Sequence, residues 1–200
     1  HLELIRQMIR KKKFKRYLID NCYPIAIDGT GKFMRNWLWD EECLEWKIQK
    51  EDGVQHQYHV YVLEANLAFQ NGMTIPLMSE VLSYTQGDTG NNKQDCETKA
   101  FYRLASRLKK AFPVLKIMLL LDGLYATGPV TKICRQNKWQ FMIVLQDGSL
   151  PSVMTEFNSL CGLEKKNCYI QKYGNRNQVF RWANDIDYRF YTCSKTTKIL

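Results

Sequence analysis

The run Leu115–Leu121 constrains the fold of this 200-residue chain more than any other segment, because six of its seven residues are apolar. A near-continuous apolar run of this length is typical of a central strand that is covered on both faces. An amphipathic helix is predicted before it, with an apolar stripe that reaches Phe112, and Pro113 ends that helix. A helix followed by a buried strand predicts an α/β protein.

Three strands are predicted nearer the N-terminus, and short turns join them. The first is Tyr23–Ile27, which the turn residues Asp28-Gly29-Thr30-Gly31 close. Residues 36–50 and 58–69 predict two more strands, with a hairpin turn at Glu51-Asp52-Gly53 between them. The tryptophans within 36–50 are best explained by packing within the sheet. Strands joined by short turns are expected to pair antiparallel.

The later elements alternate between helices and strands, which is typical of parallel pairing. They are a helix over about 128–137, a strand at Phe141–Leu145, a helix from Pro151 to Leu160, and β-like segments from Cys168 onward. Residues 73–78 predict an edge strand or the approach to a helix, and residues 85–95 predict a loop. The sequence therefore predicts a mixed sheet flanked by helices, with three antiparallel strands followed by helix-separated parallel strands.

The cysteine and histidine content excludes several kinds of site. Seven cysteines are present, an odd number without any C-x-x-C pair, which argues against a disulfide framework and a zinc ribbon. The three histidines, His1, His56 and His59, give a histidine-based metal site few places to form. No apolar run is long enough to span a bilayer, and no signal-peptide pattern opens the chain. These features predict a reduced, cytoplasmic protein without a membrane partner.

A formal net charge of +9 favours a polyanionic partner, and nucleic acid is the commonest one. Residues 2–19 combine apolar and basic positions at helical spacing, and the densest group of cations lies there. This basic cluster consists of Arg10, Lys11, Lys12, Lys13, Lys15 and Arg16. Two interpretations stay open, a solvated helix face and an arm that contacts the phosphates of DNA. We expect no small-molecule substrate.

Two apolar strands end in the same way, since Asp28 follows one of them and Asp122 follows the other, each before a glycine. An acid at the end of a buried strand lies where open α/β sheets bind ligands. Two carboxylates on neighbouring strands repel each other unless positive charge lies between them, as two Mg²⁺ or Mn²⁺ ions roughly 3.5–4 Å apart would provide. Because Asp-Gly is also common turn chemistry, the pair is a stronger signal than either residue alone.

Four stretches of the chain together resemble the insertion-sequence transposases of the DDE superfamily. They are Ala26–Gly31, Lys93–Glu97, Leu121–Ala126 and Phe180–Asp187. The resemblance implies a ribonuclease-H-like fold, with Asp28 as the first catalytic acid and Asp122 as the second. It also implies cleavage and strand transfer of DNA, with transposon ends and target DNA as partners, on the nucleoid if the source is bacterial. A β-rich insertion after the fifth strand is a further implication.

In the branch that the chain resembles, the third acid is a Glu within a Trp-Lys-Ile-Glu-like motif that follows the insertion. No such motif occurs here, so we expect the chain to stop before the third acid and to be inactive by itself. Glu156 is one candidate replacement, although a solvated helix face is the favoured explanation for it. Asp95 and Glu97 precede a basic helix, and their charge is favourable near a helix N-terminus.

The predicted organisation is a basic helical arm over 1–20, an incomplete ribonuclease-H-like core over 21–164, and the start of the β-rich insertion over 165–200. A second hypothesis is a DNA-binding remnant of a transposase without catalytic activity. A third, a nucleotide-binding α/β protein, lacks the glycine fingerprint of that class. An uncovered apolar surface near the C-terminus predicts self-association.

Overall fold

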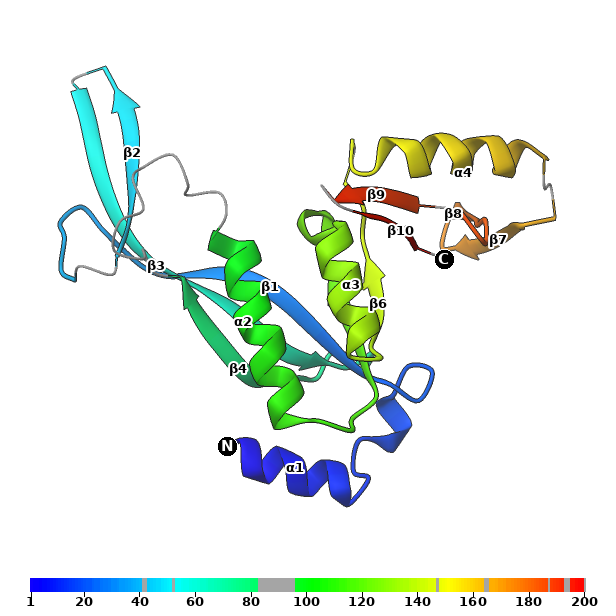
Figure 1. Ribbon diagram of the computed structural model, residues 1–200, viewed down its shortest axis with the longest axis horizontal. Helices are drawn as coiled ribbons and strands as arrows, with labels where there is room; N and C mark the ends of the chain where they lie inside the picture. Colours follow the sequence, from blue (N-terminus) through cyan, green and yellow to red (C-terminus); the bar gives the residue numbers. More distant parts are fainter. Residues whose placement is uncertain are drawn as a thin grey trace. The chain divides into compact units, whose positions relative to one another are not determined.

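A computed structural model describes residues 1–40, 43–51, 53–82, 96–146, 148–163, 166–186, 188–192 and 195–199 (Figure 1). The chain divides into two compact units, His1–Val144 and Leu145–Leu200. The predicted organisation, with boundaries after residues 20 and 164, stays a prediction. The predicted loop over 85–95 and the residues Lys93, Gln94 and Asp95 lie outside the described part of the chain.

The first unit is an α/β structure built on a mixed sheet of six strands. The strands are β1 (Tyr23–Arg35), β2 (Leu44–Lys50), β3 (Gly53–Ala68), β4 (Thr74–Leu82), β5 (Ile117–Leu121) and β6 (Gln140–Ile143). Their order is β2-β3-β1-β5-β6, and β4 also pairs with β3. β3 is antiparallel to β1, β2 and β4, whereas β5 is parallel to both β1 and β6. The predicted mixed sheet, with its antiparallel and then parallel strands, is confirmed.

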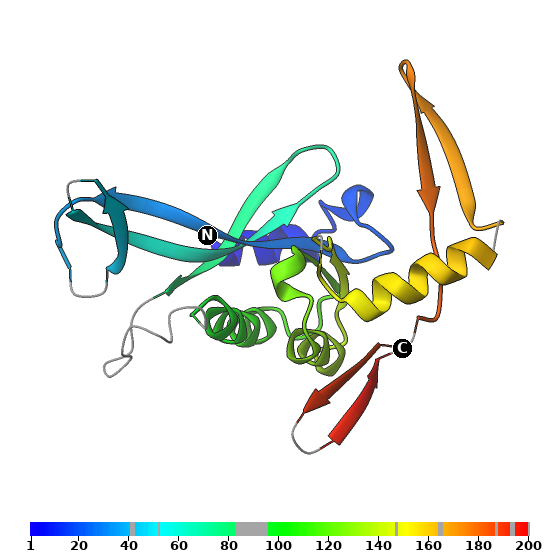
Figure 2. The same ribbon diagram turned by 90° about the horizontal axis from the view of Figure 1, so that it is seen from above.

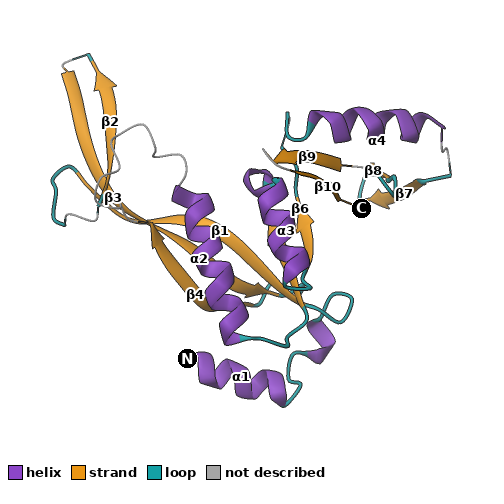
Figure 3. Cartoon of the chain, viewed as in Figure 1, coloured by secondary structure: helices purple, strands orange, loops and turns teal. Residues whose placement is uncertain are grey.

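Helices flank this sheet, and they are drawn in purple in Figure 3. They are α1 (Leu2–Arg10), a 3-10 turn at Lys15–Tyr17, α2 (Cys96–Ala111) and α3 (Gly128–Gln136). α2 and α3 lie on the same side of the sheet (Figure 2). The apolar stripe of α2, which includes Phe101 and Leu104, is fully buried in one core with Ile25 of β1 and Leu119 of β5. The predicted helices before and after β5 are therefore confirmed.

β1 does not end at Asp28, so the predicted end of the first strand is wrong. The strand continues to Arg35 and stays paired with β3 from Ile25 opposite Leu67 to Arg35 opposite Tyr58, with one register shift after Gly31. The glycines that resemble a turn in the sequence lie inside the strand. Pairing along a long neighbouring strand outweighs their weak local preference for strand structure.

The predicted helix over residues 2–19 is also too long, because α1 ends at Arg10. Lys12 has a left-handed backbone (φ 54°), which a continuing helix does not accommodate. Phe14 then turns inward, and its ring stacks on Phe69 with 5.1 Å between centroids. The N-terminal segment is thereby packed onto the same core as the sheet.

The sequence expectation also differs from the structure between Asn36 and Cys43, where the described residues form no strand. Trp37 is 57% exposed and lies outside the strands, so its predicted packing within the sheet is wrong. Trp46 is 51% exposed, but its ring packs against His59 of β3 with 4.2 Å between the ring centroids. The guanidinium of Arg35 lies 4.7 Å from the ring centroid of Trp37, which gives this exposed ring a cationic neighbour instead.

β6 is covered on one face only, whereas an uninterrupted apolar run such as Phe141–Leu145 is typical of a strand that is covered on both faces. Phe141 and Ile143 are half-buried, whereas Met142 is 54% exposed and Val144 is 70% exposed. This alternation is the pattern of a strand with one covered face. Within the first unit, an apolar strip along β6 is therefore open to solvent.

The second unit contains α4 (Pro151–Leu163) and two antiparallel hairpins. The hairpins are β7 (Cys168–Tyr173) with β8 (Arg176–Arg181), and β9 (Tyr188–Thr192) with β10 (Lys195–Ile199). The predicted helix after Pro151 and the β-like segments after Cys168 are present. None of the helices in the described residues has the length and apolar character needed to cross a membrane.

Candidate active site

The register of β1 and β5 brings Asp28 and Asp122 to the same level of the sheet. The last paired residues are Ala26 and Leu120, and the two acids lie two positions further along each strand. Paired strands are separated by about 4.7–4.9 Å, and residues at equal positions point to the same face. Asp122 follows the last residue of β5, whereas Asp28 lies within β1. The two acids are thus at the same level of neighbouring strands, and only Asp122 is at a strand end.

Each of the two carboxylates accepts a hydrogen bond from a nearby backbone N–H group. Asp28 Oδ1 accepts a hydrogen bond from the N–H of Gly29 at 2.8 Å. Asp122 Oδ1 accepts one from the N–H of Leu124 at 3.0 Å and caps the 3-10 turn Gly123–Tyr125. Both side chains are exposed, and among the described residues no lysine or arginine forms an ion pair with either. The pair therefore presents two adjacent negative charges to solvent.

Carboxylate oxygens are the ligands that Mg²⁺ prefers, so the chemistry of this pair fits a hard divalent ion. Asp28 and Asp122 would hold such an ion. The described residues contain no group of three His, Cys, Asp or Glu side chains arranged to bind a metal. Glu156, the candidate third acid, has an exposed side chain on α4 in the second unit. The first unit thus supplies a pair of ligands without a preassembled third one.

Sequence analysis missed two tyrosines that belong to the same electrostatic cluster. Burial raises the pKa of Tyr61 to about 12, and the hydrogen bond to Glu97 and the charges of Glu97, Asp28 and Asp122 act in the same direction. Burial likewise raises the pKa of Tyr125, together with the charges of Glu97 and Asp122. Both phenols are therefore neutral at physiological pH, and the negative charge of the cluster resides on the acids.

Gly29 is required by the close approach of Tyr61. A Cβ atom on Gly29 would lie 2.2 Å from the hydroxyl oxygen of Tyr61. Tyr61 pairs with Gly31, which shares the same face of the sheet, so its side chain extends along that face over Gly29. The sequence offered no signal for this contact beyond the glycine itself, which was explained as a turn residue.

The basic cluster precedes β1. It runs from Arg10, the last residue of α1, to Arg16 in the 3-10 turn. All six of its side chains are exposed. Arg10 lies 3.7 Å from Glu3, and Arg16 lies over the ring of Tyr17. The four lysines form no ion pair among the described residues. They are thus available to an external anion.

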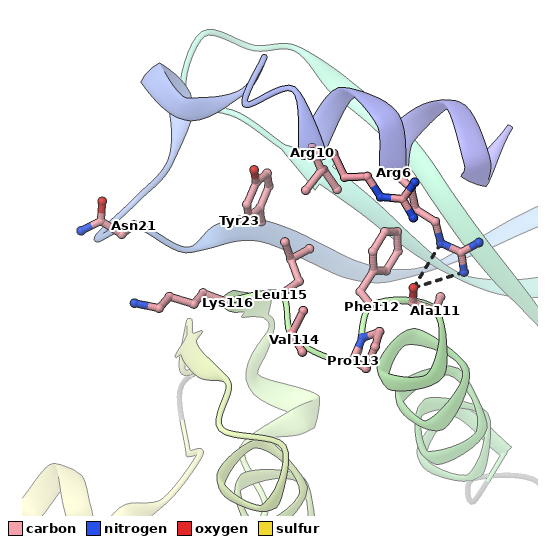
Figure 4. A pocket seen from close by; sticks show the side chains of 11 residues that line it. Arg6, Arg10, Asn21, Tyr23, Ala111, Phe112, Pro113, Val114, Leu115 and Lys116 are labelled. Atoms are coloured by element: carbon pink, nitrogen blue, oxygen red, sulfur yellow. Dashed lines mark hydrogen bonds between the residues drawn. The ribbon is translucent and has the colours of Figure 1, made fainter.

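Three cationic side chains line a pocket beside this cluster (Figure 4). Arg6 and Arg10 line it from α1, and Lys116 lines it from the segment before β5. Arg6 donates hydrogen bonds of 3.2 and 3.3 Å to the carbonyl oxygen of Ala111, which satisfies the C-terminal end of α2. Arg6 therefore has a structural role in joining α1 to α2.

Comparison with known proteins gave no relative from which this site could be interpreted. No protein-family model matches the chain, and no curated protein gives a significant match to it.

We expect Gly29→Ala to displace the Tyr61 side chain, because a Cβ atom there would lie 2.2 Å from the Tyr61 hydroxyl oxygen. Such overpacking should lower the free energy of unfolding by about 1–3 kcal/mol. Chemical denaturation measures this change. Gly31→Ala is the matched control, because nothing lies within 4 Å of its Cβ position. Equal effects of the two substitutions would contradict the proposed close approach.

We also expect the stability of the protein to fall as the pH rises from about 10 towards about 12, through the ionisation of Tyr61. A tyrosine whose pKa is higher in the folded state binds its proton more tightly there, so its contribution is complete below pH 10 and is lost above. Absorbance at 295 nm, compared between the parent chain and Tyr61→Phe, isolates the ionisation of this phenol. Glu97→Gln should move that ionisation to lower pH. A Tyr61 ionisation near pH 10 in the parent chain would contradict the assignment.

Proposed function

We propose that the chain is part of the catalytic core of a DNA transposase of the DDE type, which cleaves and joins DNA phosphodiesters with divalent metal ions. The observation that carries this proposal is the level placement of Asp28 and Asp122 on adjacent parallel strands. An exposed pair of acids without an ion pair in the described residues suits a cationic cofactor.

The sheet order supports a ribonuclease-H-like arrangement. Three antiparallel strands, β4, β3 and β1, are followed by the parallel strands β5 and β6. The first acid lies on the strand that joins the antiparallel part to the parallel part, and the second lies after its parallel neighbour. Under this proposal, the hairpins of the second unit are the start of the β-rich insertion that the resemblance implies.

In this mechanism, Asp28 and Asp122 hold Mg²⁺ or Mn²⁺ through their carboxylate oxygens. Two such ions would activate the attacking oxygen and stabilise the leaving oxygen of a phosphodiester. The basic cluster contacts the phosphates of the DNA substrate and so orients it. Contacts of this kind position DNA without reading its sequence.

A second candidate function is a DNA-binding remnant that does not catalyse. It is favoured by the lack of a group of three metal-binding side chains among the described residues. Two divalent ions usually need more than two carboxylates. Under the first proposal the third acid is Glu156 or a Glu outside this chain.

Asp28→Asn and Asp122→Asn should each abolish Mn²⁺ binding, and in a longer chain that supplies the third acid each should abolish the Mn²⁺-dependent nicking of supercoiled plasmid DNA. Each substitution removes one of the two carboxylates that would bind the ion. Electron paramagnetic resonance of free Mn²⁺ measures binding, and gel electrophoresis measures nicking. Asp20→Asn is the matched control, because Asp20 is exposed and has a left-handed backbone (φ 48°) that Asn tolerates.

The outcomes separate the two candidate functions. Binding and nicking that depend on both acids would support the enzyme. Mn²⁺ binding with DNA binding but without nicking, in this chain and in a longer one, would support the remnant, whereas nicking restored in a longer chain would support the enzyme. A parent chain that does not bind Mn²⁺ would overturn the metal-site proposal.

Replacement of four lysines of the basic cluster by Ala should weaken DNA binding and reduce its salt dependence. The residues are Lys11, Lys12, Lys13 and Lys15. Each lost phosphate contact should reduce the slope of log affinity against log salt concentration by roughly 0.9. Fluorescence anisotropy with labelled duplex DNA at several salt concentrations measures the slope.

The matched control replaces four exposed lysines elsewhere in the chain. They are Lys47, Lys50, Lys132 and Lys172. Both quadruple variants lose the same net charge, so a general electrostatic effect would change the two slopes equally. Equal slopes would show that the basic cluster is only a solvated surface.

A further inference from the structure

We propose that Arg35, Trp37 and Trp39 form a stacking platform that binds unpaired bases of DNA. The choice of DNA as the ligand rests on the function proposed above, and the platform adds to that function a site for single-stranded nucleotides. It gives a role to an exposed tryptophan that the sequence had placed within the packing of the sheet.

The platform continues an alternation of ring and cation that begins in β1. Phe33, Arg35, Trp37 and Trp39 occupy every second position of the sequence. Phe33 and Arg35 lie in β1, where alternate residues point to the same face of the sheet. The alternation continues past the end of the strand, because the side chain of Arg35 contacts both tryptophans.

The three side chains of the platform hold one another in place. The guanidinium of Arg35 lies 4.7 Å from the ring centroid of Trp37 and 5.5 Å from that of Trp39. Both distances are within the range of about 6 Å over which a cation is attracted to an aromatic face. The two rings meet edge to face, with 6.2 Å between centroids and 77° between planes. The Trp37 ring is therefore oriented although more than half of it is exposed.

Further exposed apolar side chains surround the platform in the sequence. Phe33, Met34 and Leu38 are all more than half exposed, as Trp37 is. Single exposed apolar residues are common, whereas a group of them marks an interaction site. This group lies at one end of β1 and in the segment that follows it, so we expect a ligand there.

Unpaired bases fit this surface by shape and by charge. Every base has a flat π face that stacks on an aromatic ring, and arginine adds a cation–π contribution to such sites. Among the described residues no carboxylate forms an ion pair with Arg35, so its charge is available to a nucleotide. The net charge of +9 favours DNA over an acid-poor protein surface as the partner.

The platform lies on the strand that carries Asp28. Arg35 follows Asp28 by seven residues, which corresponds to about 23 Å of extended strand. β1 pairs with β5 only as far as Ala26, and it continues beyond that strand beside β3 (Figure 2). Since DNA rises about 3.4 Å per base pair, roughly seven base pairs span the distance from the acid to the platform.

The test measures the affinity for a labelled single-stranded oligonucleotide and for its duplex by fluorescence anisotropy, without divalent ions. Trp37→Ala should weaken binding of the single strand about tenfold, as loss of a stacking ring does elsewhere, and should leave duplex binding unchanged. Trp37→Phe keeps a ring and should retain most of the affinity. Arg35→Lys keeps the charge but loses the flat guanidinium, so it should also weaken binding of the single strand.

An abasic oligonucleotide of the same length separates stacking from charge, because it keeps the phosphates and lacks the bases. The parent chain should bind it about tenfold more weakly than the intact single strand. This difference should shrink in Trp37→Ala.

Trp182→Ala is the matched control, because Trp182 is 42% exposed and lies in the second unit. We expect it to leave the preference for the intact single strand unchanged. Circular dichroism checks that each variant folds as the parent chain does, and Trp37→Phe and Arg35→Lys decide the question should Trp37→Ala fail to fold.

The outcomes for this inference differ from those for the metal-dependent function. Single-strand binding that depends on Trp37 supports the platform even in a chain that binds no Mn²⁺. Equal affinities of the parent chain and Trp37→Ala, or equal effects of Trp37→Ala and Trp182→Ala, overturn the platform even if both acids bind Mn²⁺. Self-association that Trp37→Ala abolishes, without a preference for intact over abasic DNA, would assign the surface to a second copy of the chain and would also overturn it.

Discussion

The parallel pairing of β1 with β5 is the constraint on which the candidate site depends. Its register places Ile25 opposite Leu119, and both side chains are fully buried. A shift by one residue would move these side chains out of the core, so burial fixes the register. The same register brings Asp28 level with Asp122. Apolar packing therefore determines the geometry of two polar groups that the core itself does not contain.

Two neighbouring carboxylates repel each other, and among the described residues no lysine or arginine forms an ion pair with either of them. The backbone N–H groups of Gly29 and Leu124 orient one oxygen of each acid but carry no net charge. Burial and the nearby acids raise the pKa of Tyr61, so that phenol stays neutral far above physiological pH. A divalent cation bound by both acids, as proposed, would compensate their charge.

Much of the fold was predictable because local pattern and tertiary pairing agree there. The apolar run that forms β5 and the apolar stripe of α2 each bury the face that the sequence indicates. Prediction failed where pairing overrides a local signal, as at Gly29, which has turn chemistry but lies within a long strand. It also failed for Tyr61, because its close approach to Gly29 crosses from one strand to the next, and no local pattern in the sequence records such packing.

The docking of α2 on the sheet depends on charge as well as on its apolar stripe. Arg103 and Arg107 of α2 lie 2.5 and 2.6 Å from the two carboxylate oxygens of Glu80 on β4. Burial raises the pKa of Glu80, but the hydrogen bonds and charges of the two arginines outweigh it and hold that pKa below its usual value. An acid with a lowered pKa stabilises the folded state above its usual pKa, and this contribution is lost as the pH falls through the folded value. At neutral pH this anchor is intact, so the ion pairs hold α2 against β4 while its apolar stripe shares one core with β1 and β5.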